Sequence, residues 1–289
     1  MNKIWFYIMG VLLLACAVVW LVVANGNSDN LTITACDVGQ GDAFLIQRKN
    51  LQILVDGGPN SSVIKCLEKN VAFWDSVIEL VILTHPQADH ATGLIDVFRE
   101  YKVGHLLANS VNNDTQVYRA LKELALGEGV VVLNPDPAKD IRFGELFIDI
   151  IYPDTELDDD LSSSVLGSWE SSEDLNNFSI MFYLQFKDFD ALFTGDASPS
   201  VLDKILARGQ VRRVEYLKIP HHGSKNGLTQ KFFDAANPEI SAVGVGANNR
   251  FGHPSPEVLE ILSGSRVLRT DVEGEATIES NGQQWWVRQ

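Results

Sequence analysis

Short apolar runs rich in β-branched residues recur along this chain, and several end in Asp or His followed by glycine. Runs of about four to eight such residues between turn residues are typical of buried strands. The predicted strands are Leu31–Val38, Ala43–Gln47, Leu51–Val55, Val77–Thr84, Phe147–Tyr152, Ser179–Phe186, Ala191–Thr194, Val214–Ile219, Ile240–Val245, Val267–Thr270, Ala276–Glu279 and Gln284–Arg288. The predicted helices are Ser62–Asn70, Ala91–Tyr101, Thr115–Leu126, Ser198–Ala207, Thr229–Ala236 and Pro256–Leu262. This order predicts an α/β protein with two sheets covered by helices.

The composition narrows the class of protein. The 289 residues are 45% hydrophobic and 21% charged, which is ordinary for a globular chain and excludes wholesale disorder. The net charge of −15 excludes a broadly basic protein that coats nucleic acid, so any phosphate-binding surface must be local. The acidic, Ser-rich stretch from Asp154 to Asp174 is interpreted as a solvated loop, with cation binding as the alternative.

The three cysteines, Cys16, Cys36 and Cys66, form neither a disulfide framework nor a CxxC metal motif. Cys36 and Cys66 could pair, but free thiols are the favoured interpretation.

The N-terminus carries an uninterrupted apolar run from Ile4 to Ala24. A run of this length matches the roughly 20 residues that cross a bilayer as a helix. Lys3 precedes it, and the next basic residue is Arg48, so the positive-inside rule places the remainder of the chain outside the cytoplasm. We therefore predict a single-pass membrane anchor over residues 1–26 and an extracytoplasmic domain over residues 27–289. The alternative is a cleaved signal segment and secretion.

Histidines and carboxylates gather after the predicted strands. Of the six histidines, five lie in three short loops, namely His85 and His90, His221 and His222, and His253. Asp37, Asp56 and Asp196 each end an apolar strand. Because strand ends on one edge of such a sandwich converge, we expect these groups to line one cleft. His105, in the apolar run Val103–Ala108, is instead predicted to be a packed residue.

The segment from Thr84 to Gly93 carries the chemistry. His85, Asp89 and His90 follow one strand closely and supply the nitrogen and oxygen donors that divalent metals prefer. Asp196, in Thr194-Gly195-Asp196, adds a carboxylate that could bridge two ions. The order of these motifs, followed by His221 and His222, predicts a metal site.

At these residues the chain resembles a known family. It is similar to the metallo-β-lactamase fold and, within it, to the C-terminal hydrolase domain of ComEC-type DNA-uptake (competence) proteins. The matching stretches are Asp37-Val-Gly-Gln-Gly-Asp42, Leu54-Val-Asp-Gly-Gly-Pro59, His85 to Gly93, Asn176-Asn-Phe-Ser179, Thr194-Gly-Asp196, His221-His-Gly-Ser-Lys225, Asn249-Arg-Phe-Gly-His-Pro254 and Thr270-Asp-Val-Glu-Gly274. The resemblance implies a four-layer αββα sandwich with the metal site at the sheet edges.

By position, the resemblance implies metal ligands and a residue that orients them. The implied ligands are His85, Asp89, His90, Asp196 and His221, with His222 as the alternative to His221. Asp56 would orient the histidine loop. Gln87 and Asn176 fall where stronger ligands are usual, so they would be weak ligands of a first site that is expected to be empty until substrate binds, or to be absent. One or two ions are expected, zinc or manganese, with magnesium as a further option.

The predicted activity is metal-dependent hydrolysis of a phosphodiester, with single-stranded DNA as the favoured substrate. Asp89 or Asp196 would accept a proton from water, and His253 would protonate the leaving oxygen or hold the phosphate. Lys225 and Arg250 are candidate phosphate-binding residues. The alternatives are hydrolysis of a small phosphate ester or phosphorylated cell-wall component, and a degenerate binding protein without activity. A transport role would require a separate channel subunit, and the sequence leaves the oligomeric state open.

Overall fold

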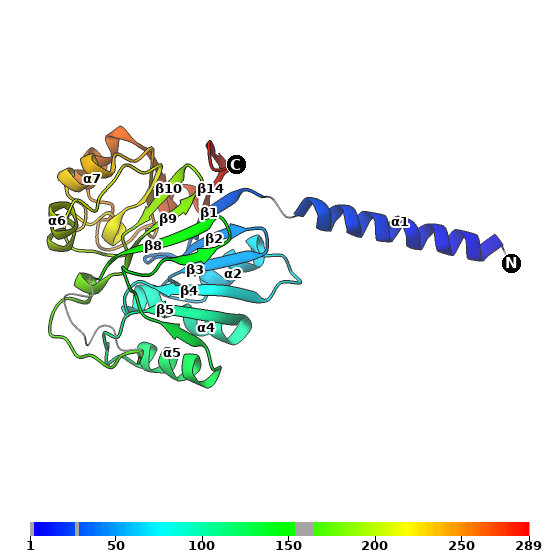
Figure 1. Ribbon diagram of the computed structural model, residues 1–289, viewed down its shortest axis with the longest axis horizontal. Helices are drawn as coiled ribbons and strands as arrows, with labels where there is room; N and C mark the ends of the chain where they lie inside the picture. Colours follow the sequence, from blue (N-terminus) through cyan, green and yellow to red (C-terminus); the bar gives the residue numbers. More distant parts are fainter. Residues whose placement is uncertain (1–2, 27–28, 154–164, 289) are drawn as a thin grey trace.

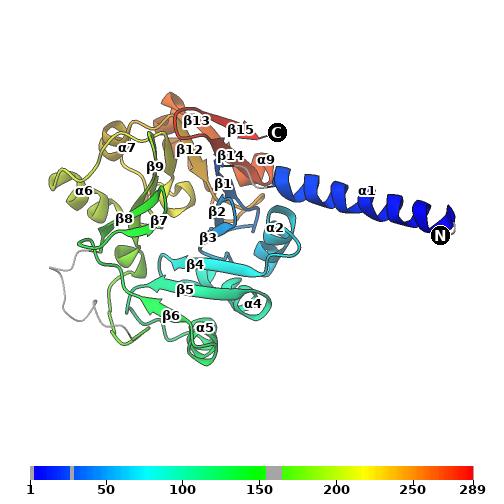
Figure 2. The same ribbon diagram turned by 45° about the vertical axis from the view of Figure 1, so that its right-hand side comes forward.

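The structure of the protein is a computed structural model that describes residues 3–26, 29–153 and 165–288. Two β-sheets pack face to face, and helices cover the outer face of each sheet (Figures 1 and 2). The predicted α/β sandwich is therefore confirmed. The stretch 154–164 of the predicted acidic loop lies outside the described residues.

The first sheet has the strand order β15-β14-β1-β2-β3-β4-β5-β6. Its strands are β1 (Leu31–Ala35), β2 (Phe44–Arg48), β3 (Leu51–Val55), β4 (Val77–Leu83), β5 (Lys102–Ala108), β6 (Val131–Leu133), β14 (Ala276–Ser280) and β15 (Trp285–Arg288). The pairs from β15 to β3 are antiparallel, and those from β3 to β6 are parallel. Parallel pairing brings the ends of β3 and β4 to one edge.

The second sheet has the order β13-β12-β11-β10-β9-β8-β7. Its strands are β7 (Ile141–Phe143), β8 (Leu146–Tyr152), β9 (Met181–Phe186), β10 (Phe189–Phe193), β11 (Tyr216–Lys218), β12 (Ile240–Val243) and β13 (Arg266–Arg269). The strands from β10 to β13 pair in parallel, so the loops after β10, β11 and β12 also share an edge.

Alternation along the strands builds the layers. In β4, Leu80 and Ile82 join the core between the sheets, whereas Val81 and Leu83 face the outer helices. Phe182 and Leu184 of β9 likewise point inward. This period of two is what a strand buried on both faces requires.

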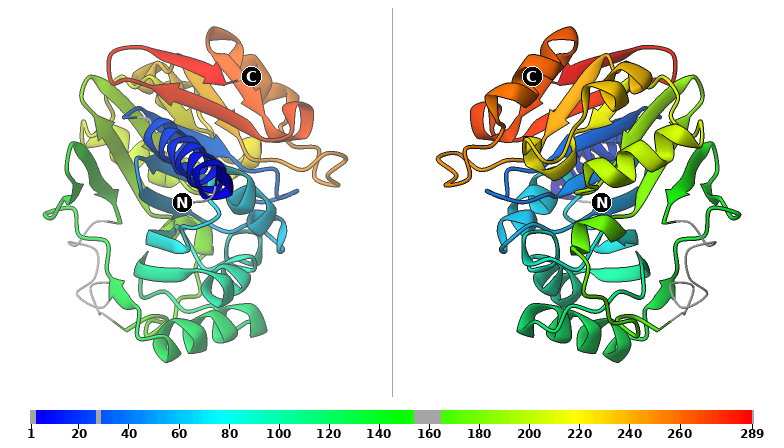
Figure 3. Two further views of the ribbon diagram at one scale, coloured as in Figure 1. Left: turned by 90° about the vertical axis from the view of Figure 1, so that its right-hand side faces the viewer. Right: turned by 90° about the vertical axis from the view of Figure 1, so that its left-hand side faces the viewer.

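Helices cover both outer faces (Figure 3). On the first sheet these are α2 (Ser62–Asn70), α3 (Ala88–Ala91), α4 (Leu94–Glu100) and α5 (Gln116–Gly127). The second half of the chain adds η1 (Leu175–Phe178), α6 (Pro199–Ala207), η2 (Pro220–Gly223), α7 (Gln230–Ala236), α8 (Pro256–Ile261), η3 (Leu262–Gly264) and α9 (Thr270–Glu273).

The N-terminal segment forms helix α1 (Lys3–Gly26), which projects from the sandwich (Figure 1). Among the residues that the structure describes, no helix combines the length and the apolar character needed to cross a bilayer. The prediction of a single-pass membrane protein is therefore wrong. That prediction was based on the apolar run from Ile4 to Ala24 and on Lys3 before it.

Two further expectations differ from the structure. Cys36 and Cys66 form a disulfide bond between the end of β1 and helix α2, although free thiols were favoured. His105 is exposed on β5 and its ring contacts the backbone carbonyl of Glu79, so it is not a packed core residue. Apolar neighbours led to that prediction, but β5 alternates between exposed and buried positions where His105 lies.

Candidate metal centre

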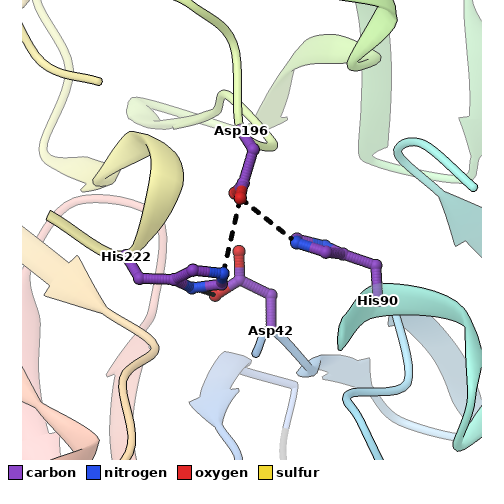
Figure 4. A group of neighbouring side chains, drawn as sticks. All are labelled: Asp42, His90, Asp196 and His222. Atoms are coloured by element: carbon purple, nitrogen blue, oxygen red, sulfur yellow. Dashed lines mark ion pairs between the residues drawn. The ribbon is translucent and has the colours of Figure 1, made fainter. Parts of the chain in front are cut away.

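Four buried side chains meet at one edge of the sandwich, where loops that flank strands of both sheets come together. Asp42, His90, Asp196 and His222 each place one potential ligand atom within 4.8 Å of the others (Figure 4). Asp42 precedes β2 and His90 lies on α3 after β4, so the first sheet supplies both. Asp196 follows β10 and His222 follows β11 in the second sheet. The group is therefore assembled equally from both halves of the sandwich.

Asp56 fixes the orientation of His90. The Nδ1–H of His90 donates to Oδ2 of Asp56 at 2.8 Å, and the same carboxylate accepts hydrogen bonds from the backbone N–H and the hydroxyl of Thr84. With Nδ1 engaged, Nε2 of His90 points at Oδ2 of Asp196, 3.4 Å away. A carboxylate behind a histidine in this way is typical of metal-binding histidines.

His222 and His85 show the same pattern of one occupied and one free ring nitrogen. Nδ1 of His222 donates to the carbonyl of Gly244 at 2.8 Å, and Nδ1 of His85 lies 3.1 Å from the hydroxyl of Thr84. The Nε2 atoms of both rings, like that of His90, are buried without a hydrogen-bond partner. Since a buried unpartnered nitrogen is costly, these three atoms fit the donor set of a divalent ion.

The backbone around the site is shaped to bring these groups together. His221 and His222 have φ angles of 53° and 54°, an unusual left-handed pair of non-glycine residues that turns the chain sharply after Pro220. Behind His222, a Cβ on Gly244 would overlap Oδ1 of Asp42, so only glycine allows that close approach.

A buried lysine neutralises part of the acidic charge. The ammonium of Lys218 makes ion pairs with Asp42 and with Asp196, and it donates to the carbonyl of Gly195 at 2.7 Å. Burial alone would lower the pKa of Lys218, but the two carboxylates raise it above its ordinary value. Lys218 therefore stays charged beside the four-residue cluster.

The histidines and carboxylates shift one another's pKa values. Burial would lower the pKa of His90, but Asp196 and Asp56 outweigh burial and raise it well above its ordinary value. Burial would raise the pKa of Asp196, but His222, His90 and Lys218 hold it well below its usual range. Burial lowers the pKa of His85 to about 3, so its ring is neutral near pH 7.

Comparison with known proteins identifies the fold family. The family model of the metallo-beta-lactamase superfamily matches residues 36–246. The chain belongs to the metallo-β-lactamase superfamily.

Two curated relatives extend this result. ComE operon protein 3 of Bacillus subtilis (strain 168) is 26% identical over 262 residues, covering 82% of this chain and 31% of that protein. Recombination protein 2 of Haemophilus influenzae is 24% identical over 252 residues, covering 85% of this chain and 28% of that protein. These matches confirm the predicted resemblance. The chain spans less than a third of the length of either relative.

Solved structures support the fold alone, because their sequence identities are low. The metallo-beta-lactamase fold protein YhfI from Bacillus subtilis has a TM-score of 0.55 at 12% identity and covers 90% of this chain and 100% of its own. A diphosphatase of the PhnP family has a TM-score of 0.51 at 13% identity and covers 87% of this chain and 99% of its own.

Within this metallo-β-lactamase sandwich, the predicted site residues fall into two groups. Asp196 and His90 lie in the four-residue cluster, and Asp89 borders it with Oδ2 3.4 Å from Nε2 of His222. His85 packs against His90, with ring centroids 4.2 Å apart. The half-buried Gln87 interacts with His85, and Oδ1 of Asn176 is buried without a partner.

The other predicted residues lie at the rim. His221 sends its backbone N–H to Oδ1 of Asp196, while its ring lies 6.0 Å from that of His253. The structure thus places the ring of His222, rather than that of His221, among the ligand atoms. Lys225 and Arg250 are exposed, and Asp37 is an exposed turn residue.

Two residues of the centre were not among the predicted site residues. Asp42 follows a glycine-rich turn, and its place in the motif Asp37–Asp42 was the available signal. Lys218 stands inside an apolar strand, where a lysine is rare unless it is paired, so its position was a usable signal as well.

Proposed function

We propose that this chain is a metal-dependent phosphodiesterase whose substrate is single-stranded DNA. The observation that carries the proposal is the buried cluster of His90, Asp196 and His222 with unpartnered Nε2 atoms. The superfamily membership supports metal-dependent hydrolysis, and the relatives named for the ComE operon and for recombination support a nucleic-acid substrate.

The residues divide the work between them. His90, His222 and Asp196 would hold the more tightly bound divalent ion, with Asp42 beside them. His85 and Asn176 have unpartnered buried donor atoms and would hold the weaker of the two ions, at the position of the first site predicted from the sequence. When bound, such an ion supplies Lewis acidity and activates water near neutral pH.

Proton transfer falls to residues at the rim of the centre. Asp89 is half-buried beside His222 and would accept the proton of the attacking water. His253 would hold the phosphate or protonate the leaving oxygen, because its ring lies beside that of His221 at the rim and its buried Nδ1 has no hydrogen-bond partner. Lys225 and Arg250, both exposed, would hold the phosphate.

The experiment compares adjacent histidines. The purified chain is tested for bound metal by elemental analysis and for hydrolysis of single-stranded DNA, RNA and small phosphodiesters with added manganese or zinc. We expect His222→Ala, His90→Ala and Asp196→Ala to lose metal and at least about a hundredfold of the rate, since ligand loss removes affinity and water activation together. His221→Ala is the matched control and should retain its metal.

Three outcomes would redirect the assignment. A wild-type chain without stoichiometric metal and without activity would indicate a non-catalytic binding protein. Hydrolysis confined to small phosphate esters would reject the DNA substrate. Metal loss in His221→Ala, with metal retained in His222→Ala, would reverse the ligand assignment.

A further inference from the structure

An exposed aromatic ring stands beside the candidate metal centre. Phe251, in the loop after β12, leaves 56% of its surface exposed to solvent. With Arg250 it forms one wall of a pocket of about 460 Å³. Gln40, Pro59 and Asp89 lie among the other residues of that pocket. Its volume is within the range of small-ligand sites.

The loop that presents Phe251 is held in place by Asn249. The side-chain oxygen of Asn249 accepts from the backbone N–H groups of Phe251 and His253, at 3.1 and 3.0 Å. Its amide group donates to the carbonyls of Gly246 and His253. The side chain of Gln40, from the loop before β2, accepts from the N–H of Gly246. The ring is therefore displayed by a braced loop, which reduces the entropy cost of binding to it.

The pocket leads directly to the metal ligands. Asp89 belongs to the pocket wall, and its Oδ2 lies 3.4 Å from Nε2 of His222. On the other side, the ring of Phe251 stacks on that of His253 at 5.7 Å, with an angle of 25° between the planes. If one group of the substrate contacts Phe251, the next group along the substrate chain would therefore lie at the candidate metal centre.

The chemistry of the pocket favours a flat, uncharged group. The carboxylate of Asp89 repels a phosphate on its own side of the pocket, whereas the face of Phe251 attracts a π-system. The guanidinium of Arg250 lies over that ring, 5.2 Å from its centroid, so a base that stacks there would displace this exposed side chain. The displaced Arg250 would pair with the adjoining phosphate. Because the chain carries a net charge of −15, attraction to the DNA backbone is weak, and stacking must supply part of the affinity.

We propose that Phe251 is a stacking platform for one base of the nucleic-acid substrate, positioned so that the adjoining phosphate reaches the metal ligands. The inference rests on the proposed function and deepens it, because it makes the base, and not the phosphate alone, a determinant of substrate choice.

The test compares two oligomers on the full chain by fluorescence anisotropy. One is a labelled thymidine oligomer, and the other has the same backbone without bases. Both carry phosphorothioate linkages that resist hydrolysis. Since stacking on an aromatic side chain contributes about 1–3 kcal/mol per base, the wild type should prefer the base-bearing oligomer by about 5-fold to about 150-fold. Phe251→Ala should remove this preference, because it should weaken the binding of the base-bearing oligomer alone. Phe251→Trp should retain the preference.

Phe73 provides the matched control. It is 94% exposed and lies in the turn before β4, at the end of the strand opposite to the histidine loop. Phe73→Ala should bind both oligomers as the wild type does. Equal wild-type binding of the two oligomers, equal weakening of both by Phe251→Ala, or no measurable binding would overturn the platform.

Hydrolysis assays on unmodified oligomers separate this result from the proposed function. Cleavage of both oligomers without any preference in binding would leave the nuclease intact and reject the platform. Cleavage of neither, with hydrolysis of small phosphodiesters, would reject the nuclease, and the platform, which rests on it, would fall too.

Discussion

The ammonium nitrogen of Lys218 lies 3.2 Å from Oδ1 of Asp196, and both side chains are almost completely buried. This contact holds one oxygen of Asp196 and leaves Oδ2 facing the Nε2 atoms of His90 and His222, each 3.4 Å away. Lys218 also pairs with Asp42, so one cation balances two buried carboxylates.

Lys218→Met should therefore destabilise the protein. Removing one partner of a buried ion pair leaves uncompensated charge and costs about 3–5 kcal/mol. Urea unfolding in the presence of a chelator measures the loss. Lys65→Met, on the exposed side of α2, is the control and should change stability by less than about 0.5 kcal/mol. Similar stabilities for the two variants would show that Lys218 does not compensate the charge of the buried carboxylates.

Asp56→Asn should weaken metal binding without unfolding the chain. The amide can still accept from Thr84 but no longer carries the charge that orients and polarises His90. Loss of such a supporting carboxylate typically costs about 10-fold to about 100-fold in metal affinity. Calorimetric titration with zinc or manganese measures the change. Asp203→Asn, at an exposed position on α6, should leave the affinity unchanged. An unaltered affinity in Asp56→Asn would contradict the role of the carboxylate.

Protons should compete with the metal ion. Burial would lower the pKa of His222, but Asp196 and Asp42 outweigh it and raise the pKa from 6.5 to about 10. The charged ring therefore stabilises the metal-free fold fully below pH 6.5, and this contribution is lost as the pH rises towards 10. Because a metal binds the neutral ring, affinity should rise from about pH 6 to about pH 9.

Calorimetry in buffers of different ionisation enthalpy reads the proton release directly. We expect the observed heat to vary with the buffer at neutral pH. A heat independent of the buffer, together with a flat affinity profile, would mean that His222 binds no proton before the metal.

The disulfide bond should contribute to stability. Cys36 and Cys66 are 30 residues apart, and closing a loop of that length in the unfolded chain corresponds to about 3–4 kcal/mol. Replacement of both by serine should lower the free energy of unfolding by about that amount. Cys16→Ser, at an exposed free cysteine, is the control. If reduction of the wild type left its melting temperature unchanged, the bond would make no such contribution.

The sequence predicted most of the helices and strands, because a buried face requires apolar residues at the regular spacing of the helix or strand. Each of the twelve predicted strands overlaps a strand of the structure, and Ser62–Asn70 was placed at its observed limits. β5 was not predicted as a strand, since Gly104 and His105 interrupt its apolar pattern. β6 and β7 are three residues each, too short for a periodic signal.

Of the candidate site, the sequence predicted only the residues that directly follow a predicted strand. His85, Asp89, His90 and Asp196 could be found because they follow apolar runs. The choice between His221 and His222 depends on two left-handed backbone angles, which no spacing in the sequence reveals. The pairing of Cys36 with Cys66 likewise depends on the packing of α2 against the end of β1.

The division of the centre between two sheets also bears on how the protein folds. Asp42 and His90 lie far along the chain from Asp196 and His222, so the cluster is a contact of high sequence separation. Such contacts form after local structure, because the loops between them must first be closed. An ion added during refolding would then find its complete set of donors only once the sheets have docked, and metal uptake would report the final step of folding rather than its nucleus.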